Sequence, residues 1–283
     1  MQPKQLLIKA LDSRRQKYRQ EFNGARANFS EDAVHDLRVA TRRILAHLDL
    51  LRLLTPELLL KPLRRELKAQ LDSLDRLRDT QVMLGEVRER METVPGLAPF
   101  QAYLEHQEQL ALRRAKKSYS EMNFVAVSRL NSDLLGLREQ LVGREEVGDP
   151  LSAGDAAFAT VTERYVAVRP SIPASFHSLR VAFKKFRYTV EIIHGLLPSF
   201  PKANLKTMDN YQTALGRIQD AEVMLGGLEG FFALDTAFDR GPARGYYEQR
   251  HEEVIAAVLQ GMSEVHSFWR AAPEQSFPWE KNP

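Results

Sequence analysis

Two blocks of sequence are repeated at a nearly constant distance along the chain. The segment VHDLRVATRRIL, which begins at Val34, aligns with FHSLRVAFKKFR, which begins at Phe176. A later segment, LDRLRDTQVML from Leu74, aligns with LGRIQDAEVML from Leu215, and six of its eleven residues are identical. The offsets are 142 and 141 positions. Two matches in the same order and at nearly the same offset indicate an internal duplication. We therefore expect the second half to adopt the same fold as the first.

Apolar residues recur at intervals of three and four, and no alternating strand pattern accompanies them, which predicts helices. Ser30 is a candidate N-cap, and Pro56 suits the first position of a helix. The predicted helices cover residues 5–22, 31–54, 55–91, 100–141, 155–168, 173–197, 201–228 and 241–270. We therefore predict an all-α fold of two pseudo-symmetric four-helix bundles, residues 1–142 and 155–270, joined by a Gly-rich and acidic linker at 143–154.

Composition limits the classes of function. The 283 residues suffice for a substantial core, and the absence of cysteine excludes disulfides, thiolate metal sites and cysteine nucleophiles. No apolar run approaches the roughly 20 residues of a membrane span, and the N-terminus lacks the pattern of a signal peptide. We expect a cytoplasmic protein that does not enter a membrane. The net charge is only +3, so attraction of a polyanion must depend on where the cations lie.

The repeated block carries a basic stripe on one face of a helix. At 100° per residue, His35, Arg38 and Arg42 fall within about 60° of one another, opposite the strongest apolar stripe. The second copy of the stripe consists of His177, Arg180 and Lys184. A lone histidine is often an interior residue, and surface arginines are often merely solvated. Here the charge is retained in both copies while Thr41 is replaced by Phe183, which favours a binding role for the stripe.

Further charged residues share this periodicity. Each copy has two more cations on the next helix, and the fourth predicted helix adds a basic group that is less well repeated. These cations are Lys61, Arg65, Lys202 and Lys206, followed by His106, Arg113, Lys116 and Lys117. Of these we predict that Lys61, Arg65, Lys202, Lys206, Arg113 and Lys117 bind the ligand. Asp79 and Asp220 are the acids that both copies of the later block retain. Because a carboxylate would repel an anionic ligand, we predict that these two aspartates orient neighbouring cations.

The motifs resemble the CHAD family, the conserved-histidine α-helical domain. HDLRVATRR followed by LRDTQVML, and HSLRVAFKK followed by IQDAEVML, match the family pattern twice and in order, from about Gln5 to Arg270. The resemblance implies a basic central groove or pore between two bundles, and a polyphosphate ligand that is bound and not hydrolysed. It assigns binding roles to His35, Arg38, Arg42, Arg43, His177, Arg180, Lys184 and Lys185. One departure is Gln219, which stands where the first copy has Arg78 and puts the equivalence of the halves in doubt.

Inorganic polyphosphate suits these residues chemically. It is an anionic polymer without bases, so recognition must come from cation spacing, charge-assisted hydrogen bonds and counterion release. Arginine side chains fit phosphate oxygens geometrically, lysines act as point charges, and histidine adds a donor whose charge depends on pH. Stacking aromatic residues, typical of proteins that bind single-stranded nucleic acid, do not accompany the stripes.

Three alternatives stay open from the sequence. A helical protein that binds RNA or DNA would attract a phosphate backbone with the same cations. An enzyme acting on polyphosphate is less favoured, because no Walker loop, HExxH or GxSxG motif occurs and no paired acids suggest a metal. A scaffold could use the cations to dock acidic partners. We predict a binding module without a cofactor, located in the cytoplasm or on polyphosphate granules.

Overall fold

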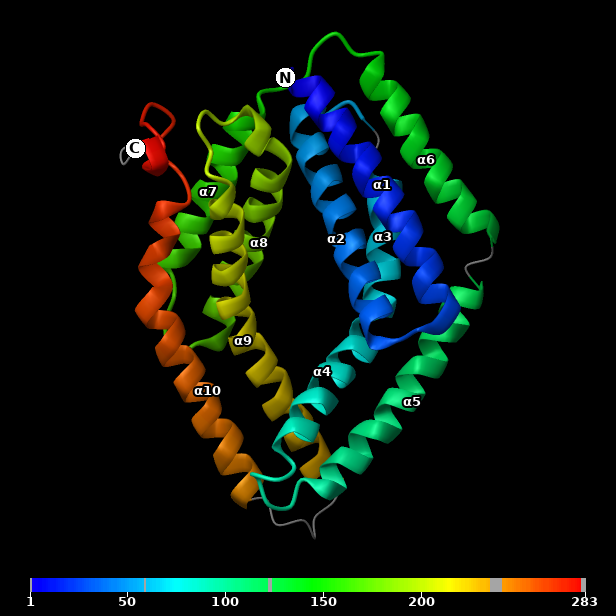
Figure 1. The fold of residues 1–283 in the computed structure, drawn as a ribbon, viewed down its shortest axis with the longest axis vertical. Coiled ribbons are helices and arrows are strands. Elements are labelled where there is room, and N and C mark those ends of the chain that lie inside the picture. The colour runs from blue at the N-terminus through cyan, green and yellow to red at the C-terminus, as the bar shows by residue number, and fades with distance from the viewer. Residues whose placement is uncertain (1, 59, 122–123, 235–240, 281–283) are drawn as a thin grey trace.

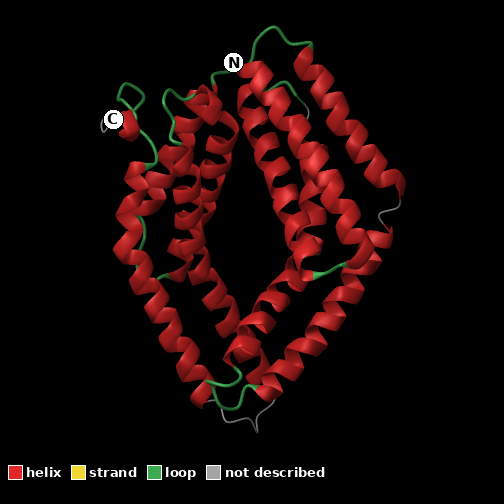
Figure 2. Cartoon of the chain, viewed as in Figure 1, coloured by secondary structure: helices red, strands yellow, loops and turns green. Residues whose placement is uncertain are grey.

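The structure is a computed structural model that describes residues 2–58, 60–121, 124–234 and 241–280. Over these residues the regular elements are helices, with no strand (Figure 2). The main helices are α1 (Pro3–Asn28), α2 (Glu31–Leu54), α3 (Lys61–Ser73), α4 (Asp75–Arg90), α5 (Ala98–Glu121), α6 (Phe124–Val142), α7 (Pro150–Val166), α8 (Pro173–Ile193), α9 (Lys202–Phe232) and α10 (Gly241–Gly261). The prediction of an all-α fold is confirmed.

Several helix boundaries differ from the predictions. The predicted helix over 55–91 is two helices, because α3 ends at Ser73 and α4 begins at Asp75. The predicted helix over 100–141 corresponds to α5 and α6, with residues 122–123 outside the described chain. The predicted linker is helical from Pro150 onward, since the Asp149 side chain accepts hydrogen bonds from Leu151 N and Ser152 N and caps α7. The first half therefore contains more helices than the predicted four.

The main hydrophobic core lies where α2 and α8 pack side by side, with α1 and α7 against them (Figure 1). Ile44 and Leu48 of α2 and Phe183 and Phe186 of α8 are fully buried in this core. At the start of α2, the Ser30 hydroxyl accepts a hydrogen bond from Ala33 N over 3.2 Å, as predicted for the N-cap. One core therefore includes residues of both halves of the chain, which pack against each other.

A second core joins the halves at the far end of the molecule. There α4 and α5 of the first half pack against α9 and α10 of the second (Figure 1). The contact is made by leucines, a methionine and phenylalanines, among other apolar residues. Phe100 of α5 lies with its ring centroid 5.5 Å from that of Phe231 of α9. Two cores therefore fix the halves at both ends, and they hold the first turns of α2 and α8 near α4 and α9. None of the described helices combines the length and apolar character that a membrane span requires.

Candidate functional site

Cations from both halves lie close to one another between the second turn and the middle of α2 and α8. Burial is the main reason that the pKa of Lys184 falls to about 8, and the positive charges of nearby cations contribute to the same shift. These cations are Arg42, Arg180, Arg38 and Lys68. Burial also lowers the pKa of Arg42, with added repulsion from Arg38 and Arg180. We call these five residues, Arg38, Arg42, Lys68, Arg180 and Lys184, the central basic cluster. It contains residues of α2 and α8 that belong to the two predicted stripes, together with Lys68 of α3, which the sequence analysis did not single out.

Arg38 is held firmly inside the protein. Its side chain is 5% exposed, and its Nη1 donates hydrogen bonds to Leu71 O at 3.2 Å and to Asp75 Oδ1 at 2.5 Å. Asp75 was not singled out from the sequence. Asp75 is the first residue of α4, directly after a break at Leu74 that no Gly or Pro marks in the sequence, so no sequence signal pointed to it. Arg38 therefore joins α2 to the α3–α4 junction and has little freedom to reach a ligand.

Arg180, the matching residue of α8, has no such anchor. Gly216 stands at the position that corresponds to Asp75, and a Cβ atom there would lie 3.7 Å from Arg180 Nε. That nitrogen is buried and has no hydrogen-bond partner among the described residues. A buried donor without a partner costs free energy, and a bound anion would satisfy it.

The two motif histidines lie at exposed positions near the cluster and have different neighbours. Partial burial lowers the pKa of His35 below its usual 6.5, and the positive charge of Arg78 lowers it further. His177 Nδ1 instead contacts Oε1 of Gln219, which occupies the position of Arg78 in the second copy. The substitution noticed in the sequence therefore changes the immediate partner of a motif histidine.

Asp79 and Asp220 lie where α4 approaches α9. Burial raises the pKa of both carboxyl groups, while nearby cations oppose the shift, Arg38 foremost for Asp79 and Arg180 foremost for Asp220. Each aspartate is thus within electrostatic range of the motif arginine of its own copy. The hydrogen-bonded partner of Arg38 is nevertheless Asp75. The orienting role of Asp79 and Asp220 stays a prediction.

The other predicted binding residues are distributed over several surfaces. Arg43 lies 3.5 Å from Glu191 of α8 and lines a 220 Å³ depression with Arg14 and Lys17, so it faces away from the central basic cluster. Lys185 is exposed on α8, and Arg113 and Lys117 are exposed on α5. Lys61 and Arg65 are exposed on α3, and Lys202 and Lys206 are exposed on α9. The structure therefore groups the stripe residues but not the whole predicted set.

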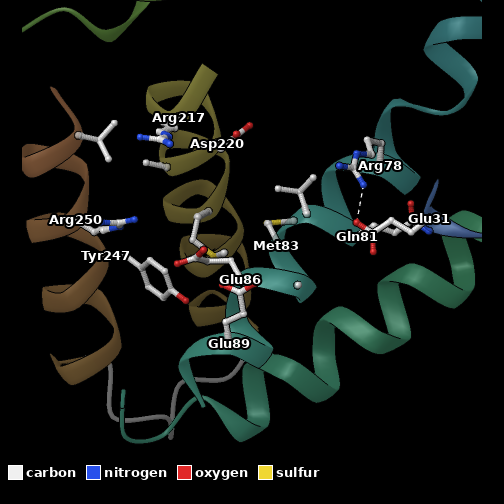
Figure 3. Close-up of a pocket in the computed structure, with 15 residues that line it drawn as sticks. Glu31, Arg78, Gln81, Met83, Glu86, Glu89, Arg217, Asp220, Tyr247 and Arg250 are labelled. Carbon is white, nitrogen blue, oxygen red and sulfur yellow. Dashed lines mark hydrogen bonds and ion pairs between the residues drawn. The ribbon is translucent and has the colours of Figure 1, made fainter. Parts of the chain in front are cut away.

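A pocket of about 380 Å³ lies between α4, α9 and α10 (Figure 3). Its lining mixes charges, since three arginines and four carboxylates contribute to it. These residues are Arg78, Arg217, Arg250, Glu31, Glu86, Glu89 and Asp220. The acids would repel a polyanion, so this pocket is a poorer candidate for such a ligand than the central basic cluster.

Comparisons with known proteins agree with this architecture. The model of the CHAD domain family matches residues 9–229. The fold is similar to the crystal structure of the CHAD domain from the plant Ricinus communis, with a TM-score of 0.75 and 20% identity, covering 92% of this chain and 91% of that one. It is also similar to PptA from Streptomyces chartreusis, with a TM-score of 0.68 and 18% identity, covering 93% of this chain and 98% of that one. A search of curated proteins gives no match. Since the family model matches most of its length, the chain belongs to the CHAD domain family.

Proposed function

We propose that this protein binds inorganic polyphosphate at the central basic cluster and does not hydrolyse it. The family to which it belongs is linked to polyphosphate binding in general. The observation that supports the proposal for this chain is the convergence of cations from α2, α3 and α8. Together with burial, their charges lower the pKa of Lys184 to about 8. The basic central groove or pore implied by the sequence resemblance remains part of this proposal.

The mutual repulsion of the cluster favours an anionic ligand. Folding brings these cations together at a cost in free energy, because like charges at short range repel and partial burial weakens screening by water. A bound polyanion removes that cost, satisfies the free Nε of Arg180, and releases its counterions. Because the cations come from both halves, one polymer can contact both and gain effective concentration.

Charge removal at the ligand-facing positions tests the proposal. The triple variant Arg42→Ala, Arg180→Ala, Lys184→Ala should bind long-chain polyphosphate at least about 100-fold more weakly in a calorimetric titration, since each charge-assisted contact contributes about 1 kcal/mol or more. Arg38 is kept because its hydrogen bonds support the fold. Arg164→Ala on α7, whose side chain is 47% exposed, is the control and should change affinity less than twofold. Equal affinity of the triple variant and the control would refute the proposal.

Two further measurements separate the alternative functions. Transfer RNA at equal phosphate concentration and near-physiological salt should fail to displace long-chain polyphosphate, because the cluster has no stacking partners for bases. Displacement would favour a nucleic-acid-binding protein. Incubation of polyphosphate with the protein and magnesium should release no phosphate above background, and release would favour an enzyme.

The location of the protein is part of the same proposal. A polyphosphate-binding module in the cytoplasm should collect on polyphosphate granules. A fluorescent fusion should therefore label granules in cells that accumulate the polymer, and the triple variant should lose that label. Granule labelling that survives the triple substitution would assign targeting to another surface.

A further inference from the structure

A second basic surface is formed by residues of α2 and α3. It is a hollow of about 460 Å³, which we call the outer groove, and its charged lining consists of five cations and one acid. These residues are Arg52, Lys61, Arg64, Arg65, Lys68 and Asp72. Arg64 is paired with Asp49 at 2.7 Å, and Lys68 Nζ donates to Asp72. Lys61 and Arg65 are exposed, and neither forms an ion pair with another of the described residues. The groove thus presents excess positive charge to solvent.

Lys68 connects the outer groove to the central basic cluster. It lines the groove, and its charge also contributes to the lowered pKa of Lys184. From Lys68, α3 extends back to its first residue, Lys61, a distance of roughly 10 Å at 1.5 Å per residue. Cations therefore continue from the cluster along α3 far enough to contact further units of a polymer that already fills the cluster.

The second copy of the repeat lacks this continuation. At an offset of 141 positions, Lys61 and Arg65 correspond to Lys202 and Lys206, but Arg64 corresponds to Leu205 and Lys68 to Asp209. The Asp209 carboxylate lies 3.2 Å from Arg187 and 3.8 Å from Lys206. A negative charge therefore stands where the first copy has the connecting lysine, and it neutralises cations that a polyanion would need.

We infer that polyphosphate leaves the central basic cluster on one side only, along the outer groove, which is a second subsite for long chains. This inference rests on the proposed function and adds a direction to it. Short chains fill the cluster alone. Long chains also contact Lys61 and Arg65, so affinity rises with chain length through the first half of the protein and not through the second.

The duplication supplies a matched control for the test. The double variant Lys61→Ala, Arg65→Ala and its counterpart Lys202→Ala, Lys206→Ala remove the same number of charges from equivalent exposed positions. Titrations with tripolyphosphate and with long-chain polyphosphate at several salt concentrations give four comparisons. We expect the first variant to lose about tenfold in affinity for the long chain, with a salt slope lower by about 1.4 for two lost contacts. The second should lose less than twofold, and neither should change tripolyphosphate binding.

The outcomes distinguish the inference from the function on which it rests. Equal losses in the two double variants would show general electrostatic attraction and overturn the one-sided path. Unchanged long-chain binding in the first variant would also overturn the one-sided path. In that case, retained binding of tripolyphosphate would show that the proposed central site still holds. If the wild-type protein binds neither ligand, both the proposed function and the one-sided path are wrong. Circular dichroism of both variants should match the wild type, since all four side chains are exposed.

Discussion

Arg38 and Arg180 occupy matching positions in the two copies of the repeat, and their surroundings differ. Arg38 is 4% exposed and bonded to Leu71 O and to Asp75. Arg180 lies against Gly216, at the position equivalent to Asp75, and its Nε has no partner among the described residues. The same motif arginine is thus part of the scaffold in one half and available to a ligand in the other.

This difference shows that the same motif residue can have a structural role in one copy and a binding role in the other. An arginine bonded to a carboxylate stabilises the junction of α3 and α4 but loses much of its attraction for phosphate. An arginine that makes no hydrogen bond with a carboxylate, as at Arg180 among the described residues, destabilises the free protein slightly and attracts an anion more strongly. We therefore expect the second copy to contribute more to polyphosphate binding at this position.

The largest effect is expected from Gly216→Asp, which gives Arg180 the kind of partner that Arg38 has. A new carboxylate beside Arg180 neutralises one cation and adds repulsion, so long-chain polyphosphate should bind about 30-fold more weakly, or about 2 kcal/mol. Stability should not fall, since Gly within a helix is unfavourable and the new pair is attractive. Gly216→Asn, of the same shape without the charge, should bind within about threefold of wild type. Equal affinities of the Asp and Asn variants would contradict this view of Arg180.

An intermediate effect is expected from Lys184→Met, which should improve stability while weakening binding. The pKa of Lys184 in the folded protein, about 8, lies below the ordinary 10.5, so its charged form opposes folding. This penalty is fully present below pH 8 and disappears as the pH rises above 10.5. At pH 7 the variant should therefore unfold about 2–4 °C higher, for a gain of about 1 kcal/mol after allowance for residual solvent screening.

The same variant should bind long-chain polyphosphate about fivefold more weakly, because one cation is lost from the cluster. Thermal unfolding at pH 7 and pH 11 checks the predicted change in stability. One titration with polyphosphate at pH 7 checks the predicted loss of affinity. A lower unfolding temperature at pH 7 would show that Lys184 is stabilised by a partner and not opposed by its neighbours.

The smallest effect is expected from Arg78→Gln, which gives the first copy the residue of the second. Removal of the Arg78 charge should raise the pKa of His35, because that charge lowers it in the wild-type protein. An NMR titration of the His35 ring would detect the change, and polyphosphate affinity should fall by no more than about twofold. Leu77→Met, a buried neighbour substitution without a charge change, is the control and should leave the His35 titration unchanged. A lower pKa of His35 in Arg78→Gln would mean that Arg78 acts mainly by shielding the ring.

Much of the fold could be predicted from the sequence because helix periodicity and capping are local. The N-cap at Ser30 and the face shared by His35, Arg38 and Arg42 follow from spacing alone. That the two stripes form one binding site stays a prediction, which rests on the charge that both copies retain. The break at Leu74 was missed, since no Gly or Pro marks it and tertiary packing decides the junction.

Contacts between helices could not be predicted in the same way. Arg43 follows Arg42 directly, and the sequence assigns both to binding, yet the 100° turn between adjacent residues directs Arg43 to Glu191. Asp75 and Gly216 were both overlooked, because their importance comes from the arginine on another helix that lies beside them. A single sequence shows which residues share a face, but not which faces meet.

The most direct test of the account is whether polyphosphate binding is coupled to protonation of Lys184. With its pKa at about 8 in the free protein, this residue is about half charged at pH 8, and an adjacent polyanion must raise that pKa. Calorimetric titrations at pH 8 in buffers of different ionisation enthalpy should show net proton uptake by the wild-type protein, and much less uptake by Lys184→Met. Tight binding with equal proton uptake in both proteins, or with none, would place the ligand away from the central basic cluster and contradict the account.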